Sequence, residues 1–497
     1  MTLDDHRGYE YDFTLELCNA IEKFTQKRTN KDSSTFFYKS SDLTYAVERA
    51  MFFRYINDES FFSLFQRYKN KTLPQKIIVH DNIESDLLTE LIHIPQENIY
   101  IKKDDLLVTT KKKMREILRI FLICSGVRSI VKVVRILKYK LTFRGLKSTI
   151  LFSAESIKFI RFLEPIVTQL TGEYAFIVQD RKVCAYLKSK KIPHVRAWSR
   201  LYFLERWAKK KDMLYKFTLT DKYDLFGDAI QIIRPKTMVL VEGNAPQDEV
   251  INRICKKVGV KSVTIQQGWS PVVHNGFRNM SYSKMLTWGD GFSELLQPYN
   301  PNEQFVSTGN HVISLKELKV NKIDNIVLFF QVKTRIISNA VWLKFIELAK
   351  KIKIKFKEKE IIVREHPVYP FSTDEREYLT EVGIKFMSAP EYSLEQVLDI
   401  ADLTISIYSS TILESIGAGV LPIIYNITSF PHYNPDISRL RAGIEVKNDN
   451  EIISVIEKLD KNRNKLLELK EHVKQFQRRF FRAGREKAIA NIISQLF

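Results

Sequence analysis

The alternation of short apolar runs with amphipathic segments, from about residue 147 onward, constrains this fold more than any other feature of the chain. Runs rich in β-branched residues, such as 237–241 and 325–330, are each followed by a segment with helical periodicity. Short, continuously apolar runs are typical of strands that are buried on both faces. Strands that alternate with helices build parallel, doubly wound sheets. The sequence therefore predicts an α/β fold.

Two such alternating units follow one another, as expected because 497 residues are too many for a single core. We expect Rossmann-like domains at 146–318 and 319–479, facing a cleft, with the polar and basic stretch 316–322 between their sheets. Residues 1–145 lack a strand–helix rhythm, so we expect a mainly helical N-terminal extension, and 480–497 is expected to form a terminal helix. The predicted strands are 148–152, 174–179, 194–198, 237–241, 262–266, 284–288 and 305–308, then 325–330, 360–364, 384–387, 403–408 and 421–425.

Two strands of the second unit end in polar groups at the edge where parallel sheets bind ligands. Arg364, Glu365, His366 and Pro367 end one strand, and the stretch 409–411 (Ser-Ser-Thr) begins a helix after the other. An imidazole can donate a hydrogen bond to a phosphate oxygen, and the start of a helix attracts anions. The pattern predicts a site for the phosphate of a nucleotide. The alternatives are a histidine satisfied by a backbone carbonyl and ordinary helix capping by Ser409, Ser410 and Thr411.

Further polar residues occupy similar positions. Glu414, one turn into that helix, is a candidate acceptor for a ribose hydroxyl, or a favourable acid in a first helical turn. Glu242 ends the strand 237–241 and is a candidate general base, the alternative being an acid that caps the turn. We expect the remaining candidates to bind an acceptor or line the cleft, unless they only form turns; they are Asn244, Gln266, Gln267, Gly268, His274 and Gly309.

The charge of the chain limits its partners. A formal net charge of +20 favours nucleic acid, an anionic membrane surface or anionic substrates. Between residues 111 and 140 the single acidic residue is Glu116, and basic residues recur at helical spacing among apolar ones. A basic amphipathic helix is typical of binding to an anionic membrane, and the alternative is a packed helix with a solvated basic face. Basic residues spread along the whole chain, without a recognition motif, argue against nucleic acid as a partner.

Several motifs are missing. The chain has no GxxxxGK[ST] loop, no GxGxxG after the first strand and no Asp-x-Asp pair. Its four cysteines lie far apart, without metal-ligand spacing, so we expect no metal and no cofactor. The N-terminal residues are acidic and include no apolar stretch typical of a signal peptide, and no 20-residue apolar span is evident. We therefore expect a cytoplasmic protein that is peripheral on the inner face of the membrane.

The residues Arg364-Glu365-His366-Pro367 and Ser406 to Glu414 resemble the "HP" and "SS/ST" motifs of bacterial GT-B glycosyltransferases of surface polysaccharides. These include polysialyltransferases, Kdo transferases and the CDP-glycerol glycerophosphotransferases of teichoic acid synthesis. The resemblance implies that His366, Ser409 and Ser410 contact the phosphate of a cytidine-nucleotide donor, with Thr411 beside them. It spans roughly residues 235–425, and implies that the terminal helix crosses back to the first domain.

In the first domain the match departs from the family pattern. The family's Gln-His-Gly reads Gln266-Gln267-Gly268, and its acidic pair reads Val241-Glu242-Gly243, which leaves Glu242 as the candidate base. The resemblance implies a metal-independent glycosyltransferase that moves a sugar from a nucleotide-sugar donor, with a CMP-sugar favoured, to a glycan or lipid-linked acceptor of a capsule or lipopolysaccharide. The alternatives are a CDP-polyol phosphotransferase and a non-enzymatic basic protein that binds membranes or nucleic acid.

Overall fold

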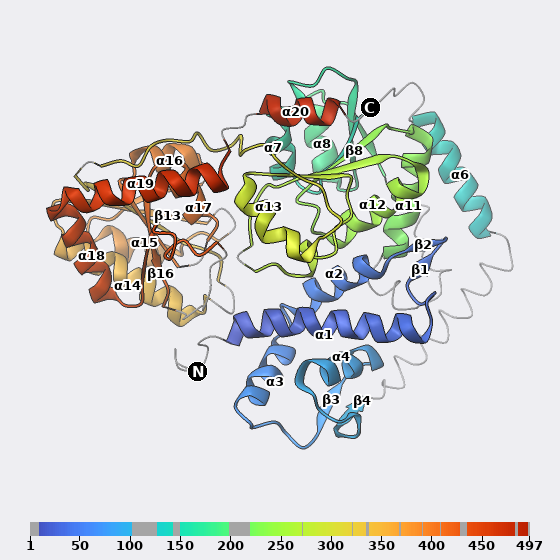
Figure 1. Cartoon of the computed structure of the whole chain (residues 1–497), viewed down its shortest axis with the longest axis horizontal. Helices are drawn as coiled ribbons and strands as arrows, with labels where there is room; N and C mark the ends of the chain where they lie inside the picture. The colour runs from blue at the N-terminus through green and yellow to red at the C-terminus, as the bar shows by residue number, and fades with distance from the viewer. Residues whose placement is uncertain are drawn as a thin grey trace.

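The computed structural model describes most of the chain (Figure 1). The described residues are 9–101, 127–142, 150–197, 219–270, 272–320, 322–333, 337–366, 369–389, 391–407, 409–427, 435–482 and 486–495. Several expectations fall outside them. Pro367, the stretch 111–126 and, within the terminal segment 480–497, residues 483–485 and 496–497 are not described.

The first domain is built on a parallel sheet of seven described strands in the order β11-β10-β9-β8-β5-β6-β7. The chain order reverses direction between β5 and β8, so the carboxyl ends of these two strands flank the switch point where doubly wound sheets bind ligands. The strands are β5 (Ile150–Ser153), β6 (Tyr174–Val178), β7 (His194–Arg196), β8 (Thr237–Val241), β9 (Lys261–Ile265), β10 (Lys284–Thr287) and β11 (Phe305–Ser307).

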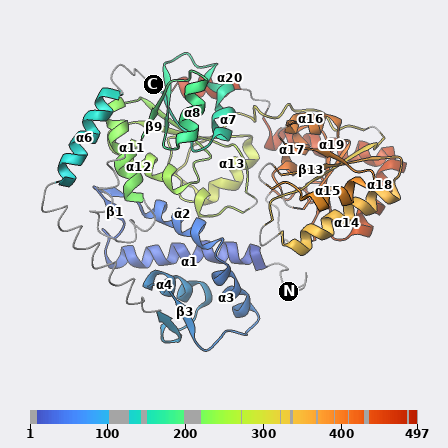
Figure 2. The same cartoon turned by 180° about the vertical axis from the view of Figure 1, so that it is seen from behind.

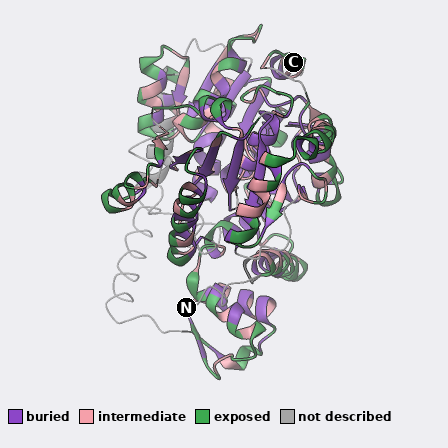
Figure 3. Cartoon of the chain, turned by 90° about the vertical axis from the view of Figure 1, so that its left-hand side faces the viewer, coloured by how far each residue is buried: buried purple, intermediate pink, exposed green. Residues whose placement is uncertain are grey.

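Helices cover both faces of this sheet, because its strands are apolar on both sides. Alternate residues of β5 and β8 enter two different cores. One core is shared with α11 (Leu219–Ile233) and α12 (Pro246–Val258), and the other with α7 (Ile157–Val167) and α8 (Arg181–Ser189). Figure 3 shows the strands as buried, with exposed residues on the outward faces of the helices. Short helices α13 (Asp290–Leu296), η3 (Asn275–Phe277) and η4 (Gln297–Tyr299) complete the domain.

The second domain repeats the design with six described strands in the order β14-β13-β12-β15-β16-β17, all parallel. Its switch point lies between β12 and β15. The strands are β12 (Asn325–Phe329), β13 (Glu360–Arg364), β14 (Lys385–Met387), β15 (Leu403–Ser406), β16 (Leu421–Tyr425) and β17 (Ile444–Val446). The helices are α14 (Asn339–Lys355), α15 (Thr373–Thr380), α16 (Leu394–Ile400), α17 (Thr411–Gly417), α18 (Asp449–Lys461) and α19 (Arg463–Phe480).

The C-terminal segment joins the two domains. After α19, the backbone N–H of Arg482 donates to the carbonyl of Trp288 at 2.7 Å, and Phe481 stacks on the Trp288 ring at 6.0 Å. The last described helix, α20 (Glu486–Ser494), then packs on α7 and buries Ile489 and Ile493 in the first domain's core. Figures 1 and 2 both show α20 beside α7 and α8, away from the rest of the second domain.

The N-terminal region packs on the first domain and does not form a core of its own. Its helices share one continuous apolar cluster with α11, α12 and one face of the seven-stranded sheet. It also contains two elements that the sequence reading did not anticipate, the antiparallel pair β1-β2 and a small parallel β3–α4–β4 unit. The elements are α1 (Tyr9–Lys31), β1 (Phe37–Tyr38), β2 (Ser41–Asp42), α2 (Thr44–Tyr55), α3 (Glu59–Lys69), β3 (Ile77–Val79), α4 (Asn82–Ile92), η2 (Gln96–Asn98) and β4 (Ile99–Ile101), followed by α6 (Val127–Thr142).

The prediction of an α/β fold with two parallel sheets and a mainly helical N-terminal extension is confirmed. Three strand predictions, 237–241, 360–364 and 421–425, match the observed bounds residue for residue. The sequence reading missed β17, α11, α13 and α15. The strand β17 has only three residues at the edge of its sheet, too short to show a pattern.

Candidate active site

A pocket of about 540 Å³ opens between the carboxyl ends of the two sheets, and we call it the active-site pocket. It brings together residues that are far apart in the sequence, so the fold converts separate strand ends into one site. From the second domain it is lined by Arg364, His366, Ser409, Ser410, Thr411 and Glu414, and from the first domain by Glu242, Asn244, Gln267, Gly268 and His274.

The end of β13 supplies two cationic or hydrogen-bonding groups. The guanidinium of Arg364 donates to the carbonyl of Ser388 at 2.9 Å, and no carboxylate of the described residues pairs with it. Glu365 also lines the pocket, where it forms an ion pair with Arg376 at 2.7 Å. Burial, followed by the nearby charge of Lys158, lowers the pKa of His366. A neutral imidazole can donate a hydrogen bond to a phosphate without requiring a second cation in the pocket.

The start of α17 presents hydroxyl groups to the pocket. The residue at the cap position, Ser410, makes no side-chain capping bond. Instead the hydroxyl of Ser409 accepts from the backbone N–H of Thr411 at 3.2 Å. The Thr411 hydroxyl is buried, and none of the described residues forms a hydrogen bond with it. A buried hydroxyl with no protein partner costs free energy, so this group is poised for a polar ligand.

Glu414 faces the same pocket from α17. Burial raises the pKa of its carboxyl from 4.5 to about 7, and the nearby Lys158 opposes that rise. Near neutral pH this carboxyl is therefore partly protonated. In the neutral form it can donate a hydrogen bond to an anionic group, which an ionised carboxylate would repel.

Glu242 occupies a strained turn directly after β8. Its φ is +62° and that of Gly243 is +68°, a left-handed conformation that costs free energy in a residue with a side chain. Gly243 is required here because a Cβ at this position would lie 2.6 Å from the hydroxyl of Thr264. The turn directs the Glu242 carboxylate to the pocket, where Asn244 donates to it at 3.1 Å. Burial raises the pKa of Glu242, while Lys158 and the hydrogen bonds from Asn244 and the Gly268 backbone oppose the rise.

A fully buried arginine from the N-terminal region holds this turn. Arg49 of α2 donates to the carbonyl of Gly243 at 2.9 Å, and the hydroxyl of Tyr282 donates to the same carbonyl at 2.7 Å. The guanidinium also lies 3.4 Å from Glu249, which is equally buried. Nothing in the local sequence around Arg49 marks this role, because its partners are contributed by distant segments.

Three of the expected cleft residues act mainly on the protein itself. The Nδ1 of His274 accepts from the backbone of Gly276 at 3.0 Å, its ring stacks on Phe52 at 4.5 Å, and burial lowers its pKa to about 3. It therefore stays neutral and shapes the pocket wall. Gln266 accepts from the Trp288 backbone at 2.9 Å, and neither Gln266 nor Gly309 is part of the pocket lining.

Lys158, in the first turn of α7, is the residue of the site that sequence reasoning missed. It lines the active-site pocket, and its charge opposes the rise in the pKa of Glu242 and Glu414 and adds to the fall in the pKa of His366. A single lysine in a helical turn carries no motif. The available signal was its position shortly after β5, the strand at the switch point.

No family model matches the chain, and no curated protein matches it. Several solved structures share part of its arrangement. One is described as the S. aureus MnaA-UDP co-structure, at 10% identity and a TM-score of 0.47, covering 70% of this chain and 95% of that one. Another is the lipopolysaccharide outer core galactosyltransferase WaaB in its apo form, at 13% identity and a TM-score of 0.42, covering 70% and 99%.

A third structure is the UDP-GlcNAc 2-epimerase from Neisseria meningitidis bound to UDP-GlcNAc, at 12% identity and a TM-score of 0.42, covering 70% and 98% of the two chains. Sequence identities of this size, with TM-scores below 0.5, assign no activity to this chain.

Proposed function

We propose that this protein is a glycosyltransferase of the GT-B type that moves a sugar from a nucleotide-activated donor, a CMP-sugar in the favoured case, to a bacterial surface glycan of a capsule or lipopolysaccharide. One observation carries the proposal. A carboxylate in a strained turn, half-buried on one domain, shares a pocket with an arginine, a histidine and a hydroxyl-rich helix start on the other. Such a pocket can hold an anionic leaving group and an attacking hydroxyl side by side.

The chemistry follows from these positions. An acceptor hydroxyl oxygen forms a bond to the anomeric carbon of the donor sugar while the bond from that carbon to the phosphate oxygen breaks. Glu242 takes the hydroxyl proton, since its raised pKa makes it a stronger base than an exposed glutamate. The electron pair leaves with the nucleotide, whose phosphate receives hydrogen bonds from Arg364, His366 and Thr411. Donors fixed in advance around a developing charge are the largest source of catalysis in many enzymes.

The proposal is tested by nucleotide binding and by one substitution. CMP, CDP, UDP and GDP are screened for a rise in Tm, because a ligand that binds only the folded state stabilises it. His366→Ala is expected to abolish sugar transfer while leaving the Tm without ligand unchanged. His80→Ala, at an exposed histidine of the N-terminal region, is the matched control. Retained transfer in His366→Ala, or no response to any nucleotide, would refute the proposal.

A CDP-polyol phosphotransferase is the second candidate, and it would use the same pocket. The guanidinium of Arg364, which has no acidic partner among the described residues, suits a second phosphate as well as a first. The two activities differ in what remains on the acceptor. Release of CMP from CDP-glycerol, with transfer of glycerol phosphate to form a phosphodiester on the acceptor, would favour this candidate over a sugar transferase.

We also propose that α6 rests on an anionic membrane surface. Its apolar side chains Ile130, Val133, Val134, Leu137 and Leu141 are between 44% and 71% exposed and recur at helical spacing, so they form one stripe. The helix lies at the edge of the molecule in Figures 1 and 2. In the described part of the chain, no helix is long and apolar enough to cross a membrane. An exposed apolar stripe on a helix with many basic residues is typical of interfacial helices.

Sedimentation with vesicles tests the membrane proposal. The full chain is expected to bind vesicles that contain phosphatidylglycerol more tightly than vesicles of phosphatidylcholine alone, and to be released by salt. Leu137→Asp should abolish binding. Leu467→Asp, at a similarly exposed leucine of α19, should leave binding unchanged. Equal binding by both variants would refute the assignment to α6.

A further inference from the structure

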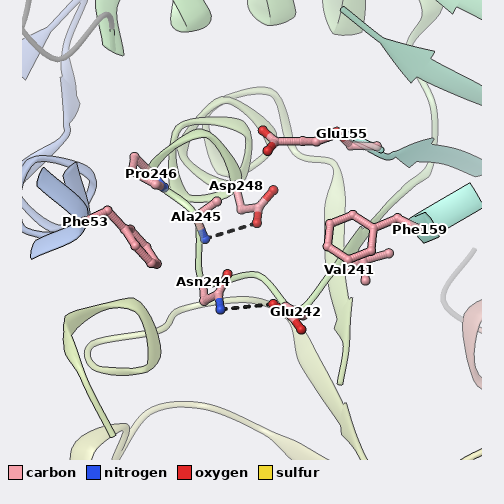
Figure 4. Close-up of a pocket in the computed structure, with 10 residues that line it drawn as sticks. Phe53, Glu155, Phe159, Val241, Glu242, Asn244, Ala245, Pro246 and Asp248 are labelled. Carbon is pink, nitrogen blue, oxygen red and sulfur yellow. Dashed lines mark hydrogen bonds between the residues drawn. The ribbon is translucent and has the colours of Figure 1, made fainter. Parts of the chain in front are cut away.

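A second pocket, of about 350 Å³, adjoins the active-site pocket and shares Glu242 and Asn244 with it. It lies at the carboxyl ends of β5 and β8, on the first domain's side of the cleft. Three carboxylates line it, those of Glu155, Glu242 and Asp248, and we call it the acidic pocket. Figure 4 shows these three carboxylates arriving from different segments of the first domain.

Two aromatic rings form opposite walls of the acidic pocket (Figure 4). Phe159 comes from α7, and Phe53 comes from α2 of the N-terminal region. Phe53 is 39% exposed, whereas its neighbour Phe52 points to another face of α2 and is buried. An aromatic ring kept accessible in a pocket offers a flat apolar face, and sugar rings present matching C–H faces.

Two nearly buried polar groups in this pocket have unused hydrogen-bonding capacity. Ser153, at the end of β5, is 4% exposed, and its hydroxyl has no hydrogen-bond partner among the described residues. Asp248 is 6% exposed, and one of its carboxylate oxygens accepts from the backbone of Ala245 at 3.3 Å. Its other oxygen has no partner within the described chain. Both free oxygens keep some exposure to the pocket, so a ligand with hydroxyl groups can reach them.

The charge of the pocket restricts what this ligand can be. Lysine and arginine are absent from the lining of the acidic pocket in the described structure. Burial raises the pKa of Asp248 well above its usual value, and the neighbouring Glu155 raises it further. An anionic group placed here would be repelled by Glu155 and Glu242, whereas hydroxyl groups could donate hydrogen bonds to the carboxylates.

We infer that the acidic pocket binds a neutral, hydroxyl-rich sugar unit of the acceptor and discriminates against sugar units that carry a carboxylate. The aromatic walls hold the ring, Asp248 and Glu155 accept from its hydroxyls, and Asn244 donates to one of its oxygens. The shared residue Glu242 then lies where one hydroxyl of the same sugar can reach the donor. This inference rests on the proposed transferase function.

The test uses two probes that differ in one group, methyl glucopyranoside and methyl glucuronide. Saturation-transfer NMR on the full-length protein, with CMP present, measures the affinity of each. The neutral glucoside is expected to bind at least about tenfold more tightly than the glucuronide, since one unfavourable charge contact of ordinary size corresponds to a tenfold change in affinity. Equal affinities, or tighter binding of the glucuronide, would overturn the inference.

Two variants locate the binding. Phe53→Ala should weaken glucoside binding about fivefold, within the range for an aromatic contact, while the Tm shift given by CMP stays the same. Phe37→Ala, at an exposed phenylalanine of β1 outside the pocket, is the matched control and should change neither quantity. Unchanged glucoside binding in Phe53→Ala would overturn the assignment to this pocket.

Glu155→Lys gives a gain of function. Glu155 is exposed, so its replacement preserves the fold, and the glucuronide should then bind at least as tightly as the glucoside. Failure of the glucuronide to improve would count against the inference. The proposed function fails separately: if sugars bind but no nucleotide does, the acidic pocket stands and the transferase proposal falls. If a nucleotide binds and neither sugar does, the transferase proposal stands and the assignment of the acidic pocket falls.

Discussion

Replacement of Arg49 by methionine tests whether the N-terminal region positions the candidate base. Arg49 is fully buried, and it holds the carbonyl of Gly243 at 2.9 Å in the strained turn that carries Glu242. Methionine keeps much of the apolar volume and removes the charge and the hydrogen bonds. The Gly243 carbonyl then loses one of the two side-chain hydrogen bonds described above and retains the one from Tyr282 at 2.7 Å.

The cost in stability can be worked from the partners left behind. Removal of one member of a buried ion pair usually costs about 3–5 kcal/mol, because the other member is left buried and uncompensated. In Arg49→Met, Glu249 still forms its ion pair with Arg253 at 2.6 Å, and the Gly243 carbonyl still accepts from Tyr282. Neither buried group is therefore left without a partner. We therefore expect the free energy of unfolding to fall by about 2–3 kcal/mol, below the usual range.

The effect on catalysis should exceed the effect on folding. Left-handed residues such as Glu242 persist only where the surroundings enforce them, so the turn should relax once Arg49 is lost. We expect kcat for sugar transfer to fall at least about tenfold, which corresponds to about 1.4 kcal/mol. The KM for the nucleotide donor should change little, because the proposed donor residues lie on the other domain.

Urea denaturation and initial-rate kinetics measure the two effects. Val47→Ala, at another fully buried residue of α2, is the control, with an expected loss of about 2–3 kcal/mol by removal of buried methyl groups. It should leave kcat near that of the unmodified protein. Equal losses of kcat in the two variants, or an unchanged kcat in Arg49→Met, would refute the idea that Arg49 acts through the Glu242 turn.

Three further predictions concern other parts of the molecule. The pKa of Glu414 is raised to about 7 in the folded protein, so ionisation of this carboxyl should lower the stability as pH rises from about 4.5 to 7. Glu414→Gln should remove the corresponding fall in Tm over this pH range. An unchanged dependence of Tm on pH in this variant would contradict the prediction. Gly419→Ala should destabilise by at least about 2 kcal/mol in urea, because φ is +72° and a Cβ would lie 2.2 Å from a backbone oxygen. Gly259→Ala, with φ +75° and open space, should cost only about 1 kcal/mol, and equal costs would rule out the backbone clash. Ile493→Ala should cost about 2–4 kcal/mol in the same assay, whereas the exposed Asn491→Ala should cost almost nothing; a neutral Ile493→Ala would show that α20 is not needed by the first domain.

Local sequence patterns were sufficient to predict the two parallel sheets. Buried parallel strands leave a direct trace, a short β-branched run, and β8, β13 and β16 were predicted with their observed bounds. The polar residues at strand ends could also be identified, because parallel strands direct their carboxyl ends to one edge. This is why Glu242, His366 and the 409–411 stretch were selected, and all of them line the active-site pocket.

The sequence could not separate residues that contact the pocket from residues that support it. Gln266 and His274 belong to the same polar strand-end pattern as Gln267, yet their hydrogen bonds are made largely with the protein itself. Lys158 belongs to no recognisable sequence pattern, although its charge affects the pKa values of three ionisable groups of the site. A side chain's hydrogen-bond partners depend on which distant segments pack around it.

The sequence by itself determined the fold class, the two repeating units and the edge of each sheet where polar groups gather, because these depend on periodicity within a few residues. Only the tertiary structure decided which residues at those sheet edges come together in a pocket. In the folded protein Glu242 and His366 line the same pocket from different domains. Arg49 binds the Glu242 turn, 194 positions further along the chain, and Phe53 lines the acidic pocket. These contacts join segments separated by a hundred residues or more, and they arise only when the N-terminal helices and the two domains pack together.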